Sequence, residues 1–237
     1  MPKKSAEQIK KELASEYYGA EASQYEEKRV SDKRHAAVVD IQYTITEKFL
    51  NEPYKKILDV ACGTGRFFRV YKGEIYGIDV SADMLKEAAK KKKAKILKQA
   101  DASKIPFKNN FFDIAITSQF IKHTPEYKQV IAEMARVVRP GGAIIIDFPN
   151  HYSITNFFTK LRVFFGKLRH YNFFSLKDIR GIAKENALEI EQIEPTVVVS
   201  PLFFPKSMLH SVMALNKSLT KWFPKLTYVY YVKFRKK

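Results

Sequence analysis

Cysteine, long apolar runs and acidic side chains are scarce in this sequence, and each scarcity excludes a class of protein. Cys62 is the only cysteine among the 237 residues, which excludes a disulfide framework and a cysteine zinc site. No stretch reaches the roughly 18 apolar residues that a membrane-spanning helix needs. The N-terminus is charged and lacks the apolar centre of a signal peptide. We therefore expect a cytoplasmic protein.

Acidic residues are outnumbered, and the imbalance is concentrated downstream. Lys and Arg number 42 against 25 Asp and Glu, a net charge of +17. Residues 151–237 carry 15 basic and 5 acidic residues, a net of +10, which leaves +7 for residues 1–150. A positive field favours anionic partners, namely nucleic acid, phosphorylated metabolites or an anionic membrane. Solubility alone is an equally good explanation.

The hydrophobic pattern divides the chain into three parts. Residues 1–50 have apolar residues at helical spacing, which predicts a helical N-terminal cap. Residues 51–150 alternate short buried strands with helices, which predicts a doubly wound, mostly parallel α/β sheet. Residues 151–237 are expected to add lid helices and two last strands, 189–199 and 226–234, to the same domain.

A glycine turn with two acids is the strongest functional signal. Asp59 lies in the first predicted strand, Gly63 and Gly65 follow it, and Asp79 ends the next strand. Ligands of open α/β sheets bind at such strand ends, and glycine lets the backbone approach them closely. A nicotinamide cofactor favours a third glycine where this chain has Phe68. S-adenosylmethionine (SAM) carries a cationic sulfonium and an ammonium group, and Asp59 suits that charge. The carboxylate of Asp79 can accept both hydroxyls of a ribose.

On these residues the chain resembles the class I SAM-dependent methyltransferases, in particular a small-molecule branch that includes quinone-biosynthesis enzymes. The resemblance covers roughly residues 25–150 well and the remainder loosely. It implies a seven-stranded sheet in the order 3-2-1-4-5-7-6, with the last strand antiparallel. Ala61 stands where the family's motif has its first glycine. The resemblance implies that SAM is bound by Asp59, Ala61, Gly63, Gly65, Asp79, Val80, Met84, Asp101, Ala102, Ser118 and Gln119.

His123 is the candidate catalytic residue, because it follows the fourth strand beside the expected methyl group. It is a candidate general base or acceptor ligand. The alternative is that His123 only precedes a helix that Thr124 caps and Pro125 begins.

An apolar stripe follows the fifth strand, and it includes Phe157, Leu161 and Phe164. The spacing predicts an amphipathic helix over residues 153–169. We expect a lid over the acceptor, with these three residues lining the pocket. The alternative is a basic interfacial helix that contacts anionic lipid, which makes the protein peripheral to a membrane.

The sequence thus predicts an enzyme that transfers a methyl group from SAM to a small, partly hydrophobic acceptor: a metabolite, a quinone or a lipid-like molecule. An RNA methyltransferase and a non-catalytic SAM-binding protein are the alternatives. Nucleic acid is the less favoured partner, because no RNA-binding module is recognisable. No metal site is expected, and the oligomeric state stays open.

Overall fold

The computed structural model describes residues 31–166 and 170–237. Most of the predicted N-terminal cap therefore lies outside the described residues, and its described part is the helix α3 (Lys33–Phe49). Asp32 begins this helix by accepting a hydrogen bond from the backbone N–H of Arg34 at 2.9 Å. Helix α3 packs on the sheet through Ile45 and Phe49.

One sheet organises the fold, and its order β3-β2-β1-β4-β5-β7-β6 confirms the predicted topology. Strand β7 pairs antiparallel with both β5 and β6, whereas the other pairs are parallel. The strands are β1 (Lys56–Val60), β2 (Glu74–Asp79), β3 (Ala94–Gln99), β4 (Phe112–Thr117), β5 (Val138–Pro149), β6 (Leu188–Pro195) and β7 (Val229–Lys236).

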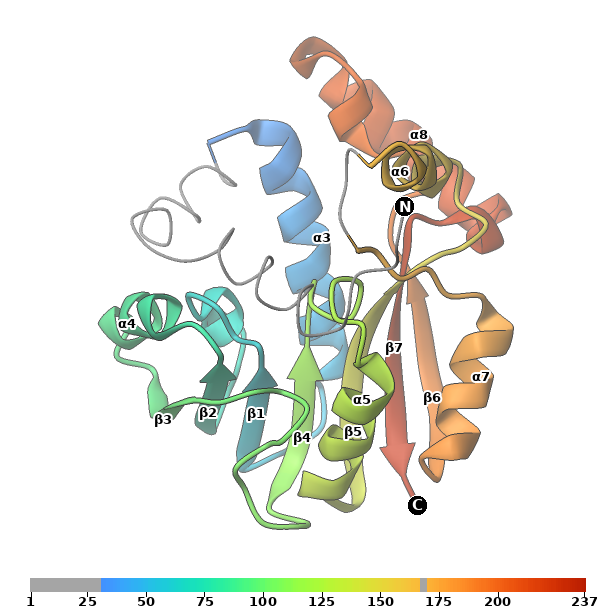
Figure 1. The fold of residues 1–237 in the computed structure, drawn as a ribbon. Helices are drawn as coiled ribbons and strands as arrows, with labels where there is room; N and C mark the ends of the chain where they lie inside the picture. Colours follow the sequence, from blue (N-terminus) through green and yellow to red (C-terminus); the bar gives the residue numbers. More distant parts are fainter. Residues whose placement is uncertain (1–30, 167–169) are drawn as a thin grey trace.

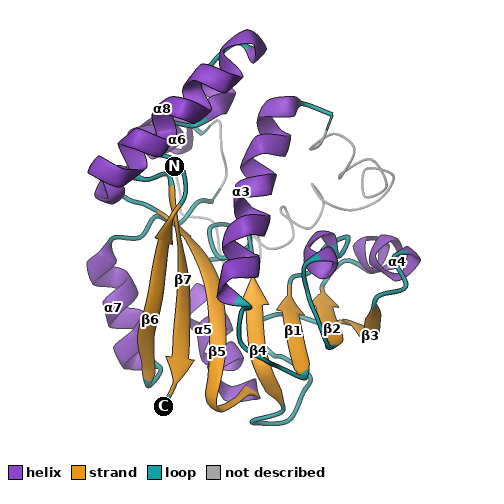
Figure 2. Ribbon diagram, turned by 180° about the vertical axis from the view of Figure 1, so that it is seen from behind, coloured by secondary structure: helices purple, strands orange, loops and turns teal. Residues whose placement is uncertain are grey.

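Helices cover both faces of the sheet, so the core has two layers. Helices α5 (Tyr127–Val137) and α7 (Leu176–Glu185) pack on one face. Helices α3 and α4 (Ala82–Lys90), with the short 3-10 helix η1 (Arg66–Arg69), pack on the other. Figures 1 and 2 show α6 (Ile154–Phe164) and α8 (Leu209–Trp222) beyond one end of the sheet, on the side of β7 and β6.

Two predicted helix boundaries were wrong. Helix α5 begins at Tyr127 and its N-cap is Glu126, not Thr124. The carbonyl oxygen of Thr124 accepts a hydrogen bond from the Asn172 side chain at 2.7 Å, and the Ile121 carbonyl accepts another at 2.9 Å. These long-range bonds hold residues 121–124 as a turn. The alternating pattern of residues 51–150 also predicts a helix between the first two strands, through Phe67, Phe68 and Val70. This segment forms only the 3-10 helix η1, which ends at Arg69.

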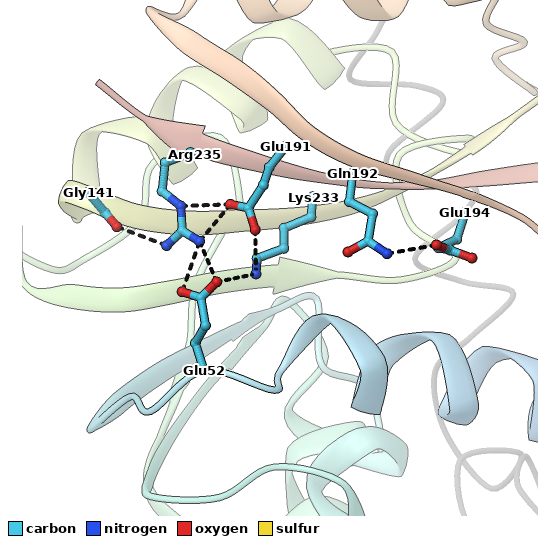
Figure 3. A network of polar contacts seen from close by, with 7 residues as sticks. All are labelled: Glu52, Gly141, Glu191, Gln192, Glu194, Lys233 and Arg235. Atoms are coloured by element: carbon cyan, nitrogen blue, oxygen red, sulfur yellow. Dashed lines mark hydrogen bonds and ion pairs between the residues drawn. The ribbon is translucent and has the colours of Figure 1, made fainter.

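The antiparallel strand β7 is tied to its surroundings by a charged network (Figure 3). The Lys233 side chain is 3% exposed, and its Nζ lies 2.7 Å from Glu191 and 3.1 Å from Glu52. Arg235 contacts the same two carboxylates at 2.6 and 2.8 Å. Glu52 follows α3, so the network joins this helix end to β6 and β7.

No helix in the described ranges combines the length and apolar character that crossing a bilayer requires.

Candidate functional site

The glycine turn after β1 has a left-handed backbone at three positions. Ala61, Gly63 and Gly65 have φ angles of 57°, 54° and 71°. A Cβ atom at Gly65 would lie 2.5 Å from the buried ring of Phe68, whereas one at Gly63 would meet open space. The turn therefore requires Gly65 for packing and leaves room beside Gly63.

Asp79 holds this turn from the end of β2. Its carboxylate accepts hydrogen bonds from the backbone N–H of Gly63 at 2.8 Å and of Ser81 at 2.9 Å. Burial raises the pKa of Asp79, and the backbone N–H groups oppose that rise. Each carboxylate oxygen keeps lone-pair capacity for a further donor, such as a ribose hydroxyl.

Asp59 is buried in β1 and does not cap the glycine turn in this way. Its Oδ2 accepts a hydrogen bond from the Tyr71 hydroxyl at 3.0 Å. Burial, reinforced by the nearby Asp79, raises the pKa of Asp59 to about 7, and the Tyr71 hydrogen bond opposes the shift. Two adjacent acids in a poorly solvated place make a site that favours a cation.

Arg66 is a residue that the sequence argument missed. It follows the glycine turn, and its Nη1 atom is buried with no hydrogen-bond partner among residues 31–166 and 170–237. Its charge lowers the pKa of Asp59 and also that of Asp147 in β5. A buried donor without a partner is costly. Arg66 therefore offers a binding group for an anion, such as the carboxylate of a methionine moiety.

The predicted adenine-side residues follow β2 and β3. Val80 is 54% exposed, which leaves its side chain available for packing, whereas Met84 and Ala102 are buried. Asp101 Oδ1 already accepts hydrogen bonds from the N–H and the hydroxyl of Ser103, both at 2.7 Å.

A polar cluster lies where β4 and β5 end beside β7. Gln119 has a left-handed φ of 64°. The Asp147 carboxylate accepts hydrogen bonds from the backbone N–H of Gln119 at 2.7 Å and from the Gln119 side-chain amide at 2.8 Å. The Lys122 ammonium donates a hydrogen bond to the side-chain amide oxygen, Oε1, of Gln119. Ser118 and Tyr231 are joined through their hydroxyls at 3.0 Å. Ser118 and Gln119 were predicted, and their partners were not.

Burial dominates the electrostatics of this cluster. It raises the pKa of Asp147, while the positive charge of Lys122 opposes the rise. It also raises the pKa of Tyr231, so this phenol stays protonated. A signal for Asp147 was present in the sequence: it is the one acid within an otherwise apolar run of β5.

His123 lies in the turn after β4, with its ring edge-on to the Tyr171 ring at a centroid distance of 5.5 Å. Phe157, Leu161 and Phe164, which were predicted to line a lid over the acceptor, lie on α6 and are 56%, 39% and 82% exposed. In the part of the chain that the structure describes, no group of three His, Cys, Asp or Glu side chains is placed to hold a metal ion.

Comparisons with known proteins agree with this geometry. Residues 58–146 match the model of the methyltransferase domain family. A demethylmenaquinone methyltransferase of Bacillus mycoides is 29% identical over 177 residues, 61% of this chain and 74% of that protein. Residues 58–146 therefore form a methyltransferase domain, and the sheet order is that of the class I SAM-dependent methyltransferase fold.

Solved methyltransferase structures share this fold. Magnesium protoporphyrin IX methyltransferase from Synechocystis, solved with bound S-adenosylhomocysteine (SAH), has a TM-score of 0.65 at 15% identity. That likeness covers 97% of this chain and all of the other. A possible histamine N-methyltransferase from Thermotoga maritima has a TM-score of 0.63 at 18% identity, over 86% and 94% of the two chains.

SAM is the cofactor of this methyltransferase. The residues present fit it, because Asp59 suits its positive groups, Asp79 keeps acceptor capacity for its ribose hydroxyls and the space beside Gly63 is open. Nη1 of Arg66, which has no hydrogen-bond partner within the described part of the chain, suits its carboxylate.

Proposed function

We propose that this methyltransferase transfers a methyl group to a partly hydrophobic small molecule with an aromatic or quinone-like ring. The names of the relatives support this acceptor, since they are demethylmenaquinone methyltransferases. The observation that carries the proposal is the juxtaposition of two polar centres at one end of the sheet. The acids of β1 and β2 form one centre, and the Gln119–Asp147–Lys122 cluster forms the other.

In this proposal the cofactor binds along β1 and β2. Asp79 accepts the ribose hydroxyls, Asp59 balances the positive charge, and Val80 packs on the adenine. The residues Ala61, Gly63, Gly65, Met84, Asp101 and Ala102 complete the cofactor site. Bound SAM supplies an activated methyl group, so the protein mainly positions the acceptor and excludes water.

The polar cluster after β4 positions the acceptor in this proposal. Asp147 fixes the left-handed turn at Gln119, and this turn orients Ser118 and Lys122. The Lys122 ammonium is suited to an oxygen that gains negative charge. His123 is the proposed base where the acceptor must lose a proton.

The cofactor assignment is tested by calorimetry with Asp79→Ala. The wild-type protein should bind SAM and SAH at about micromolar level or tighter. The variant should bind both about 10- to 100-fold more weakly, because it loses charge-assisted hydrogen bonds worth roughly 1.5–3 kcal/mol. Asp113→Asn is the matched control, since Asp113 contacts Lys56 and Arg139 at the opposite end of the sheet.

The control variant should keep the wild-type affinity. Tight binding of NADH without binding of SAM would contradict the cofactor assignment. The acceptor is tested separately, by mass spectrometry of a lipid and metabolite extract incubated with the protein and SAM. A methylated RNA in place of a methylated ring compound would contradict the proposed acceptor.

A further inference from the structure

Helix α6 turns its apolar side outward. Six side chains at helical spacing, which we name the α6 face, are 39–82% exposed: Ile154, Phe157, Phe158, Leu161, Phe164 and Phe165. The buried residues of the helix are polar, namely Thr155 and Asn156. A helix that packs on a protein core shows the opposite pattern. The amphipathic helix was thus predicted, but its apolar side does not pack on the described protein.

Buried hydrogen bonds fix this orientation. The Asn156 amide donates to the carbonyl oxygens of Asn150 at 2.8 Å and Tyr228 at 2.9 Å. The Thr155 hydroxyl donates a hydrogen bond to the backbone carbonyl oxygen of Val198 at 3.4 Å and accepts one from the backbone N–H of Ser200 at 3.3 Å. Rolling the α6 face inward as a lid would break these bonds and leave buried polar groups unpaired.

The exposed apolar surface continues beyond α6. Phe158 contacts Phe203, which is 57% exposed, at a ring-centroid distance of 5.8 Å. On α8, which lies at the same end of the sheet, Leu215 and Trp222 are 52% and 74% exposed. Figure 1 shows α6 and α8 at the end of the sheet where the parallel strands finish, on the side of β5, β7 and β6. Isolated exposed apolar residues are ordinary, but a contiguous set marks an interaction surface.

Charge indicates the chemistry of the partner. Residues 151–177 and 196–237, which contain both helices, include no Asp or Glu. Arg162 on α6 and Lys206, Lys217 and Lys221 near or on α8 are exposed. A second copy of the chain would bring the same positive charge against this surface, so self-association there is disfavoured. An apolar face with a basic surround suits a bilayer with anionic headgroups.

We propose that the α6 face docks this methyltransferase on an anionic lipid bilayer. The aromatic side chains enter the boundary between headgroups and acyl chains, and Arg162 and the lysines contact the lipid phosphates. The docked protein presents the carboxyl ends of its parallel strands to the membrane. This placement gives an apolar acceptor a short path from the lipid to the site. The apolar character of the acceptor rests on the proposed function.

Vesicle flotation tests the docking without any methyl acceptor, so its failure is distinguishable from failure of the proposed function. The wild-type full chain should bind vesicles with about one third phosphatidylglycerol at least tenfold better than pure phosphatidylcholine vesicles. Phe157→Ser combined with Phe164→Ser should lower binding to the anionic vesicles about tenfold or more. Affinity for SAH and the melting temperature monitor the fold of this variant.

A charge-reversal pair separates this face from the rest of the basic surface. Arg162→Glu on α6 and Lys93→Glu after α4 change the net charge equally, and both side chains are exposed. Only Arg162→Glu should weaken vesicle binding several-fold. The proposal is overturned by equal binding of wild type to neutral and anionic vesicles, or by unchanged binding of the double serine variant. It is also overturned if these phenylalanines are needed for a dimer and not for vesicle binding.

Discussion

At the residue scale, Ala61 stands where the family's motif has glycine, and the backbone there is left-handed with a φ of 57°. A Cβ atom in this region costs roughly 1–2 kcal/mol. The neighbouring glycines at 63 and 65 adopt the same region without that cost. The chain therefore stores strain at the turn that is proposed to hold the cofactor.

Ala61→Gly should relieve this strain. Because glycine also makes the unfolded chain more flexible, the net gain in the free energy of unfolding should be small, about 0–1 kcal/mol. Ala89→Gly on the exposed side of α4 is the matched control and should cost about 1 kcal/mol. Urea unfolding of both variants measures the difference. A loss of 1 kcal/mol or more in Ala61→Gly would show that the methyl group is needed for packing.

Asp59 gives a pH dependence with a defined sign. Its folded-state pKa of about 7 lies above the ordinary value of 3.8, so folding favours the protonated form. The stability contribution is complete below pH 3.8 and is lost as the pH rises through 7. Binding of a cation favours the ionised form, and SAM affinity should therefore increase over the same interval.

Asp59→Asn should remove this dependence. The wild type should lose about 3 kcal/mol of stability from this group between about pH 5 and pH 8, and the variant should not. The variant should also bind SAM more weakly at the higher pH, since it lacks the carboxylate. Thermal unfolding and calorimetry at the two pH values measure both effects. Parallel stability curves for the two proteins would contradict the raised pKa.

At the element scale, β7 combines an apolar core strand with one buried cation. Its even-numbered side chains Tyr230, Val232 and Phe234 pack against α5 and α7. On its other face, Lys233 is 3% exposed between Glu52 and Glu191. Hydrogen bonds from Arg235 and Lys233 lower the pKa of Glu52. The antiparallel position of β7 thus depends on long-range charge pairing as well as on apolar packing.

The combined change Glu52→Ala and Glu191→Ala should destabilise the protein by about 3 kcal/mol or more, because it leaves a buried ammonium uncompensated. Lys233→Met should cost about 1 kcal/mol or less, since it removes that charge and Arg235 still pairs with both carboxylates. Urea unfolding compares the two variants. A larger loss for Lys233→Met than for the double alanine variant would contradict a cost that arises from the unpaired lysine.

At the scale of the whole molecule, one end of the sheet gathers both polar centres and the outward apolar helices. The parallel strands β1, β2, β4 and β5 all end there. The net charge of +17 is densest in the segments that contain α6 and α8. The proposed cofactor site, the proposed acceptor site and a basic apolar surface are therefore brought to the same end of the sheet.

The sequence by itself determined the sheet order and the glycine turn between two acids, because both depend on local patterns that recur in a known family. It also determined that α6 is an amphipathic helix. Only the tertiary structure decided that Asp79 holds the turn while Asp59 contacts Tyr71. It alone paired Gln119 with Asp147, which are 28 residues apart. The direction of the α6 face was likewise set by the buried bonds of Asn156 to Asn150 and Tyr228. Periodicity defines the two sides of a helix, but contacts distant in sequence decide which side is buried.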